Sequence, residues 1–262
     1  MKNQLLAASL SLGVVSAAFG SVSFTGSYFQ DFDGLGQSGS TTLNGRGPHA
    51  INGILGSTGM EGWYGANFTG SSGNTEFKAH NGSLSGAAGR GVVFFGADGS
   101  TDRALGALPT SNQISSFGVV LTNTSSQTFV ALDISFIGEQ WRTGDANIFN
   151  VLRFSYGMGT SLEDATTTFT GLDFATPNLA GGNVALDGNN AANQTAINDV
   201  ITGLKWAPGQ SIVLRWDIQD LTGQDNGLAI DNFYAVGIVP APGALALLGV
   251  AGLVGIRRRR IA

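Results

Sequence analysis

Two stretches of this chain decide its fold: Phe129-Val-Ala-Leu-Asp-Ile-Ser-Phe-Ile137 and Ser211-Ile-Val-Leu-Arg-Trp-Asp-Ile-Gln219. Large apolar residues occupy every second position in both, namely Val130, Leu132, Ile134 and Phe136, then Ile212, Leu214, Trp216 and Ile218. The opposite face of the second stretch carries Ser211, Arg215, Asp217 and Gln219. Because successive side chains of a strand point to opposite faces, this period of two predicts half-buried β-strands.

Four further stretches have the same character, at residues 91–95, 117–122, 148–156 and 228–236. Only residues 191–201 suggest a helix, and they lack a cap and an apolar stripe. Strands without interleaved helices predict an all-β, antiparallel β-sandwich. We expect one jelly-roll-like domain over residues 21–237, in which the glycine-, serine- and asparagine-rich segment 34–85 forms loops between short strands or a flexible insert.

The composition excludes several classes of protein. The 262 residues are 42% hydrophobic and 12% charged, which is typical of a folded domain rather than a disordered chain. Cysteine is absent, so disulfides, thiolate metal sites and cysteine nucleophiles are excluded. Without Lys2 and Arg257 to Arg260, eight basic residues face eighteen acidic ones. Such a surface repels phosphate backbones, and we expect no nucleic-acid partner.

The first 20 residues have the pattern of a signal peptide. Lys2 supplies a positive start, residues 5–15 are apolar, and the small residues around Ala18 and Gly20 suit cleavage. The alternative, a buried first helix, is disfavoured because the segment has no polar face. The pattern therefore predicts export.

The C-terminal segment 238–262 has the pattern of a membrane-spanning tail. A short proline motif precedes an apolar stretch and an arginine cluster; the motif is Val239, Pro240, Ala241, Pro242 and Gly243, and the cluster is Arg257, Arg258, Arg259 and Arg260. From Ile238 to Ile256 a helix would be about 28 Å long, close to the thickness of a bilayer core. The positive-inside rule keeps the arginines in the cytoplasm and places the β domain outside.

This tail resembles the PEP-CTERM sorting signal, which has a proline motif, an apolar helix and terminal arginines. The resemblance implies an exosortase-type sorting protease as partner, and cleavage near the proline motif. The chain has Ala241 where the family motif has glutamate. The alternative is an ordinary membrane anchor, which would leave the β domain on the same side of the membrane.

Several short runs in the domain resemble the β-sandwich ectodomains of PEP-CTERM proteins, which are similar to concanavalin-like and MAM-type jelly rolls. These runs are Phe29-Gln-Asp-Phe-Asp-Gly-Leu35, Asp102-Arg-Ala-Leu-Gly106, Gly138-Glu-Gln-Trp-Arg142, Leu186-Asp-Gly-Asn189 and Gly227-Leu-Ala-Ile-Asp-Asn-Phe233. The resemblance implies the fold more than an activity, because this fold carries sugar binders, glycosidases and adhesion modules.

Acidic residues at both ends of the domain suggest a structural calcium site. Asp31 and Asp33 open the domain, while Asp231 and Asn232 lie in its last predicted strand. If the first and last strands are neighbours, these oxygen ligands could hold Ca²⁺ and join the two ends. The alternative places them at turns and on solvated faces.

Two aromatic runs are candidates for ligand contact. Glu139, Trp141 and Arg142 could form a platform for a sugar ring, and so could Trp63 and Tyr64 in a glycine-rich segment. The alternative for the first run is structural: Trp141 covers the core while Glu139 pairs with Arg103 or Arg142. That structural alternative is favoured. For Trp63 and Tyr64 the alternative, a hydrophobic plug under their loop, is equally open.

No catalytic motif is present, and a triad would have to use His49 or His80. The leading hypothesis is a non-enzymatic envelope or matrix protein that has a structural role or binds extracellular polysaccharide. The alternatives are an extracellular carbohydrate-active hydrolase and a calcium-dependent adhesion module.

Overall fold

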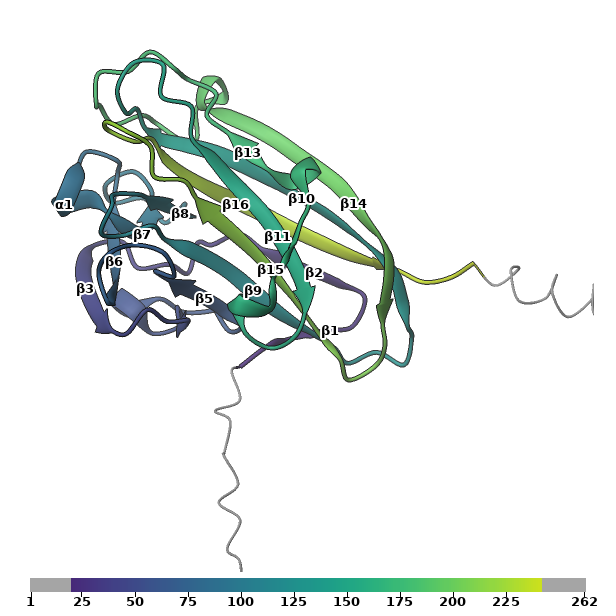
Figure 1. Cartoon of the computed structure of the whole chain (residues 1–262). Helices are drawn as coiled ribbons and strands as arrows, with labels where there is room; N and C mark the ends of the chain where they lie inside the picture. The colour runs from purple at the N-terminus through teal and green to yellow at the C-terminus, as the bar shows by residue number, and fades with distance from the viewer. Residues whose placement is uncertain (1–19, 242–262) are drawn as a thin grey trace, which may run out of the picture.

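Two β-sheets packed face to face make up most of the regular structure in the computed structural model, which describes residues 20–241 (Figure 1). We name each sheet after its central strand, the β15 sheet and the β16 sheet. The all-β sandwich predicted from the alternating stretches is therefore confirmed. The predicted signal peptide, and the predicted tail after Ala241 with Pro242, Gly243 and the arginine cluster, lie outside the described residues.

The β15 sheet has the strand order β12-β11-β15-β9-β5-β4, with β1 beside β9 and β13 beside β11. Its strands are β1 Val22–Phe24, β4 His49–Ala50, β5 Trp63–Ala66, β9 Ser116–Asn123, β11 Val151–Met158, β12 Thr167–Thr168, β13 Phe174–Ala175 and β15 Ser211–Ile218.

The β16 sheet has the order β14-β10-β16-β8-β7-β6-β3, with β2 beside β16. Its strands are β2 Ser27–Gln30, β3 Gly39–Asn44, β6 Asn74–His80, β7 Gly91–Phe95, β8 Ala104–Leu108, β10 Phe129–Arg142, β14 Gln194–Trp206 and β16 Gly227–Ile238. Short helical turns connect them, namely α1 Gly86–Gly89, η1 Ile54–Gly56, η2 Leu162–Asp164, η3 Thr170–Leu172 and η4 Ala191–Asn193.

All six stretches predicted as strands are strands, but three expectations need correction or refinement. The helix suggested over residues 191–201 is wrong, because only Ala191–Asn193 forms a helical turn before the edge strand β14 begins. The sandwich is not wholly antiparallel, since β1 pairs with β9 and β6 with β7 in parallel. The segment 34–85 contains β3 to β6, so its expected short strands are present.

The core lies between the two inner faces and is rich in aromatic rings. Trp216 of β15 is its centre, and its ring contacts five other rings from both sheets: Trp63, Phe117, Phe136, Phe154 and Phe233. The alternation of β15 thus buries Trp216 and turns Arg215 and Asp217 to the outside of the sandwich. This outward face carries the candidate site.

Within residues 20–241, no helix has the length and apolar character needed to span a membrane.

Candidate functional site

The residues predicted from sequence as ligand contacts are all buried. The exposed fraction is 0% for Trp63, 1% for Trp141 and Glu139, 3% for Arg142 and 4% for Tyr64. A sugar platform needs an exposed ring face, so this burial does not fit the platform hypothesis for either aromatic run.

The run Glu139 to Arg142 instead anchors loops to the outer face of the β16 sheet. The indole N–H of Trp141 donates to Glu139 Oε2 at 2.8 Å, and the Trp141 ring stacks on Phe95. Arg142 donates to the Gly82 and Asn183 carbonyl oxygens at 2.9 and 2.6 Å. The structural interpretation of this run is therefore supported, but its expected ion pair is not formed: Glu139 bonds Trp141 and Gln194, not arginine.

The predicted calcium ligands come from strands that are indeed neighbours. β2 pairs with β16, with Phe29 opposite Tyr234, which places Asp31 and Asp33 near Asp231 and Asn232. However, Asn232 Nδ2 donates to Asp231 Oδ2 at 2.7 Å, and among residues 20–241 no three acidic, histidine or cysteine side chains lie close enough to hold a metal ion. The calcium site stays a prediction.

Asp231 and Glu139 form a pair of buried carboxyl groups. Asp231 lies opposite Ile137, two residues before Glu139, so both side chains leave the same face of the β16 sheet. Burial raises the pKa of Glu139 to about 7 and the pKa of Asp231 to about 8, and the Glu139 charge adds to the second shift. Both carboxyls are at most 4% exposed, so a polymer substrate cannot reach them.

An open pocket of about 760 Å³ lies on the outer face of the β15 sheet, and we call it the β11–β15 pocket. Strands β9, β11 and β15 supply its floor, and the loops between strands supply its walls. Its lining includes Arg46, Phe68, Ile114, Ser116, Arg153, Ser155, Glu163, Arg215, Asp217 and Gln219.

The pairing register of β9, β15 and β11 builds the pocket floor in two rows. Arg153, Asp217 and Ser116 lie opposite one another in the first row. Ser155, Arg215 and Gly118 form the second, where the Leu162 side chain packs against Gly118. The floor thus places two guanidinium groups, one carboxylate and two hydroxyl groups at neighbouring positions of the sheet.

Hydrogen bonds hold the floor side chains in place. Asp217 accepts from Ser116 Oγ at 2.5 Å and from Arg215 Nε at 2.9 Å, while Arg215 Nη1 donates to the Leu162 carbonyl oxygen at 2.7 Å. In the amide orientation that satisfies both groups, the Gln219 oxygen accepts from Arg153 Nε and Nη2 at 3.2 and 2.7 Å. Each guanidinium is therefore fixed in orientation before any ligand arrives.

Phe68 forms an apolar part of the wall. It is partly buried, and the Arg215 guanidinium lies 5.7 Å from the centre of its ring. This distance is that of a cation–π contact, which positions the ring and the cation relative to each other.

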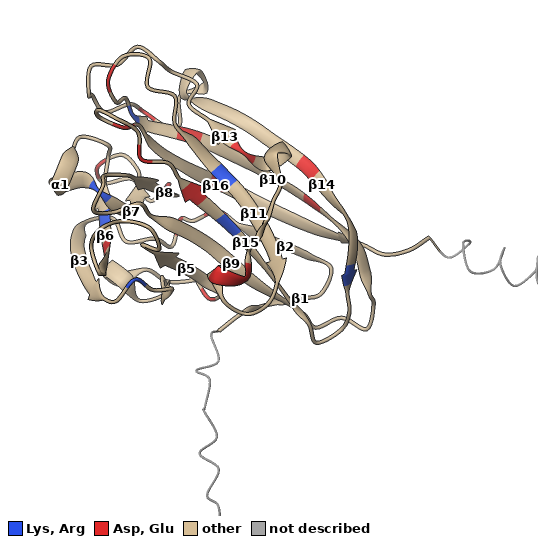
Figure 2. Ribbon diagram, viewed as in Figure 1, with Lys and Arg blue, Asp and Glu red and all other residues tan. Residues whose placement is uncertain are grey.

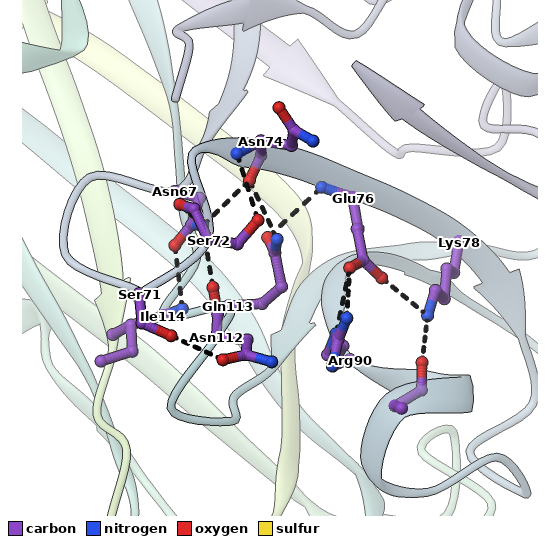
Figure 3. A network of polar contacts seen from close by, with 11 residues as sticks. Asn67, Ser71, Ser72, Asn74, Glu76, Lys78, Arg90, Asn112, Gln113 and Ile114 are labelled. Carbon is purple, nitrogen blue, oxygen red and sulfur yellow. Dashed lines mark hydrogen bonds and ion pairs between the residues drawn. The ribbon is translucent and has the colours of Figure 1, made fainter. Parts of the chain in front are cut away.

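A buried asparagine fixes the loop that carries Phe68 (Figure 3). Asn67 Nδ2 donates to the carbonyl oxygens of Ser72, Asn74 and Asn112, and its Oδ1 accepts from the backbone N–H groups of Gly70 and Ile114. This single side chain ties the 67–74 loop to the neighbouring loop at 112–114. Arg46 Nη1 adds bonds to the carbonyl oxygens of residues 67, 68 and 70, so this wall is built as a unit.

One feature of the sequence indicates part of this pocket. The alternation of residues 211–219 already placed Arg215, Asp217 and Gln219 on the face away from the core. Their partners Arg153 and Phe68 lie 62 and 147 positions earlier than Arg215 in the chain. The pairing of β11 with β15 brings Arg153 to the pocket, and the loop after β5 brings Phe68.

Comparisons with known proteins are weak. No protein-family model and no curated protein matches the chain. Among solved structures, it is similar to the K3 cleaved adhesin domain of Lys-gingipain from Porphyromonas gingivalis, at 11% identity and a TM-score of 0.35, covering 67% of this chain and 92% of that one. It is also similar to the K2 adhesin domain, at 12% identity and a TM-score of 0.32, covering 80% and 97%.

A third similar structure is TmCBM61 in complex with β-1,4-galactotriose, at 13% identity and a TM-score of 0.24, covering 53% of this chain and 74% of that one. No property of this chain is inferred from matches at these identities and TM-scores.

Proposed function

We propose that this chain is an exported cell-envelope or matrix protein whose β-sandwich binds extracellular polysaccharide in the β11–β15 pocket. One observation carries the proposal: a partly exposed phenylalanine lies beside pre-oriented arginine, carboxylate and amide groups on an accessible sheet face. Apolar surface with a few fixed polar groups is the usual composition of a ligand site.

The chemistry of the pocket matches a pyranose. Phe68 offers an apolar surface to the C–H face of a sugar ring, and the floor offers donors and acceptors to its hydroxyl groups. Because Arg153, Arg215 and Asp217 are already held by neighbouring groups, little side-chain freedom is lost when a sugar binds. The open shape also lets a polymer chain pass through without a free end.

We expect the purified protein to bind at least one neutral or acidic polysaccharide. Phe68→Ala should weaken this binding by about tenfold, because an aromatic contact adds roughly 1 kcal/mol beyond its buried area and a tenfold change in affinity corresponds to about 1.4 kcal/mol. Affinity electrophoresis followed by isothermal titration calorimetry measures this effect. Phe149→Ala is the matched control, because Phe149 is 53% exposed and does not line the pocket. Equal losses in both variants, or no binding to any polymer, would contradict the proposal.

The hydrolase alternative rests on Glu163 and Asp217, which line the same pocket. A glycosidase needs two carboxyl groups on either side of the scissile bond. Here Asp217 is committed to Arg215 and Ser116, which favours binding over catalysis. The binding experiment distinguishes the two: new reducing ends that appear during incubation with a bound polymer, and disappear in Asp217→Asn, would identify a hydrolase.

The proposal also includes the signal peptide at residues 1–20 and sorting of the chain by the tail at residues 238–262, through an exosortase-type protease. The proline motif, apolar stretch and arginine cluster support it. We expect protein recovered from its native cells to end near Pro240 to Gly243 and to lack Arg257 to Arg260. Intact-mass and C-terminal peptide measurements test this, and a chain that retains the arginines would mean a plain membrane anchor.

A further inference from the structure

We propose that the β11–β15 pocket is specific for acidic polysaccharide and that its arginines bind the carboxylate of a hexuronic acid residue. This inference rests on the proposed function and adds the chemical class of the ligand to it. It follows from the distribution of charge, from the unpaired arginine nitrogens and from the geometry of the floor.

The charge of the pocket differs in sign from that of the rest of the domain. Residues 20–241 contain eight basic and eighteen acidic side chains. Three of the eight basic residues line this one pocket, Arg46, Arg153 and Arg215, against two of the eighteen acidic ones, Glu163 and Asp217. Figure 2 shows basic and acidic segments next to each other around β11 and β15. The pocket lining thus has a net positive charge in a domain whose net charge is negative, which favours an anionic ligand at this position.

Each floor arginine keeps one nitrogen for a ligand. Arg215 uses Nε for Asp217 and Nη1 for the Leu162 carbonyl, and Arg153 uses Nε and Nη2 for Gln219. Within the part of the chain that the structure describes, Arg215 Nη2 and Arg153 Nη1 have no hydrogen-bond partner. Two guanidinium groups with spare N–H donors, fixed on adjacent strands, suit the two oxygens of one carboxylate.

The surroundings of the two arginines leave this charge available. Asp217 is the one floor carboxylate, and Ser116 and Arg215 already satisfy it. Asp173 also interacts with Arg153: burial raises the pKa of Asp173, and the Arg153 charge opposes this rise. Asp173 does not line the pocket, however, and its Oδ1 accepts a hydrogen bond from the Phe154 backbone N–H. Glu163 is exposed at the rim.

A second unpaired group lies in the floor. Ser155 is 4% exposed, lines the pocket, and its buried hydroxyl has no hydrogen-bond partner within residues 20–241. It lies opposite Arg215 in the pairing of β11 with β15. A rotation of its side chain toward the pocket would give a hydroxyl donor and acceptor beside the carboxylate position, as recognition of a sugar acid requires.

The geometry also argues for a sugar acid rather than a simple anion. The Arg215 guanidinium lies against Phe68, so a carboxylate bound to its free edge places the attached ring near the phenylalanine. Gln219 and Asp217 would then face ring hydroxyls. A small inorganic anion would use the arginines and leave the aromatic and amide groups without a role.

The test compares uronate polymers with their uncharged counterparts. The probes are polygalacturonate and alginate, each as the acid and as the methyl ester, together with neutral galactan and mannan, titrated calorimetrically into the purified protein. We expect the acid forms to bind at least about tenfold more tightly than their esters, since hydrogen bonds between charged groups exceed neutral ones in strength.

Arg153→Gln is the variant of choice, because Arg153 is exposed and its loss leaves the Leu162 anchor of Arg215 in place. We expect it to weaken binding of the acid polymer by about tenfold and of the ester by less than about twofold. The matched control is Lys205→Gln, which makes the same change in net charge at an exposed position of β14, in the other sheet.

The outcomes separate this inference from the function on which it rests. Equal affinity for acid and ester, or equal effects of Arg153→Gln and Lys205→Gln, would overturn the uronate assignment and leave polysaccharide binding intact. If none of the acidic and neutral polymers binds, both proposals fail.

Discussion

Trp216→Ala is expected to lower the free energy of unfolding by about 3–5 kcal/mol, the usual cost of truncating a large buried aromatic side chain. Trp216 is fully buried and contacts five aromatic rings from both sheets, so its removal leaves a cavity at the middle of the sandwich. Urea denaturation followed by circular dichroism measures the change.

Two further variants make this prediction specific. Trp216→Phe should cost much less, because it keeps most of the ring volume and removes an indole N–H that has no hydrogen-bond partner among residues 20–241. Phe149→Ala, at a 53% exposed position, should change stability by less than about 0.5 kcal/mol. If Trp216→Ala were no more destabilising than Phe149→Ala, the aromatic cluster would not be the centre of stability.

The position of Trp216 could be predicted from sequence because it depends on local alternation alone. In residues 211–219 the apolar side chains occupy every second position, and the structure buries those same residues. β10 follows the same rule over most of its length, since Leu132, Ile134 and Phe136 join the core. At its start the prediction is wrong, because Phe129 joins the core instead of Val130 where the pairing with β14 shifts register. Strong alternation over eight or nine residues therefore predicts both the strand and the face that it buries.

The same rule fails for β14, which resembled a helix, because its alternation changes phase. Ile201 faces the core, but so do Leu204 and Trp206, at positions of the opposite parity. Gly203 lies between them with a φ of 74°, and the pairing of β14 with β10 shifts register near Phe129. Before Gly203 the edge strand buries only Ile201, so the segment 191–201 has no apolar period of two, and the bulge after it changes the phase of the remaining buried residues.

The β11–β15 pocket could not be predicted because its residues form no local sequence pattern that differs from that of a buried polar network. The run Glu139 to Arg142 combines a carboxylate, an indole and a guanidinium, as a sugar site does, yet distant loops cover it. A Cβ atom placed on Gly188 would lie 2.2 Å from the Trp141 ring, which shows how closely that backbone covers the indole. Arg215 also has an aromatic and an acidic neighbour, Trp216 and Asp217, but the alternation of β15 turns Trp216 into the core, and the pocket's aromatic ring, Phe68, comes from a distant loop.

Raising the pH from 5 to 9 is expected to destabilise the protein by about 2–4 kcal/mol, chiefly because two buried carboxyl groups must lose their protons. Burial raises the pKa of Glu139 to about 7 and of Asp231 to about 8, against roughly 4 for both groups in an unfolded chain. The folded state therefore binds more protons than the unfolded state between pH 4 and 8, and stability falls as the pH rises through that window. Denaturation midpoints measured at each pH unit test this slope.

Asp231→Asn identifies the group responsible. The amide keeps the shape of the side chain and its oxygen can still accept from Asn232, but it carries no charge at any pH. We expect the variant to lose much of the slope and to be more stable than the wild type at pH 9. Glu139→Gln is less informative, because Glu139 accepts one bond at each carboxylate oxygen, from Trp141 and from Gln194, and an amide keeps only one acceptor.

The effect should be smaller than the sum of the two separate shifts, because the raised pKa of Asp231 already includes the repulsion from the Glu139 charge. Asp225, whose pKa burial raises to about 7, adds a slope of the same sign and remains in the variant, so the slope will not vanish. Asp133→Asn, at an exposed position of β10, is the control and should retain the wild-type slope. If Asp231→Asn also retained that slope, the buried pair would not be the origin of the pH dependence, and ionisation elsewhere in the protein would have to explain it.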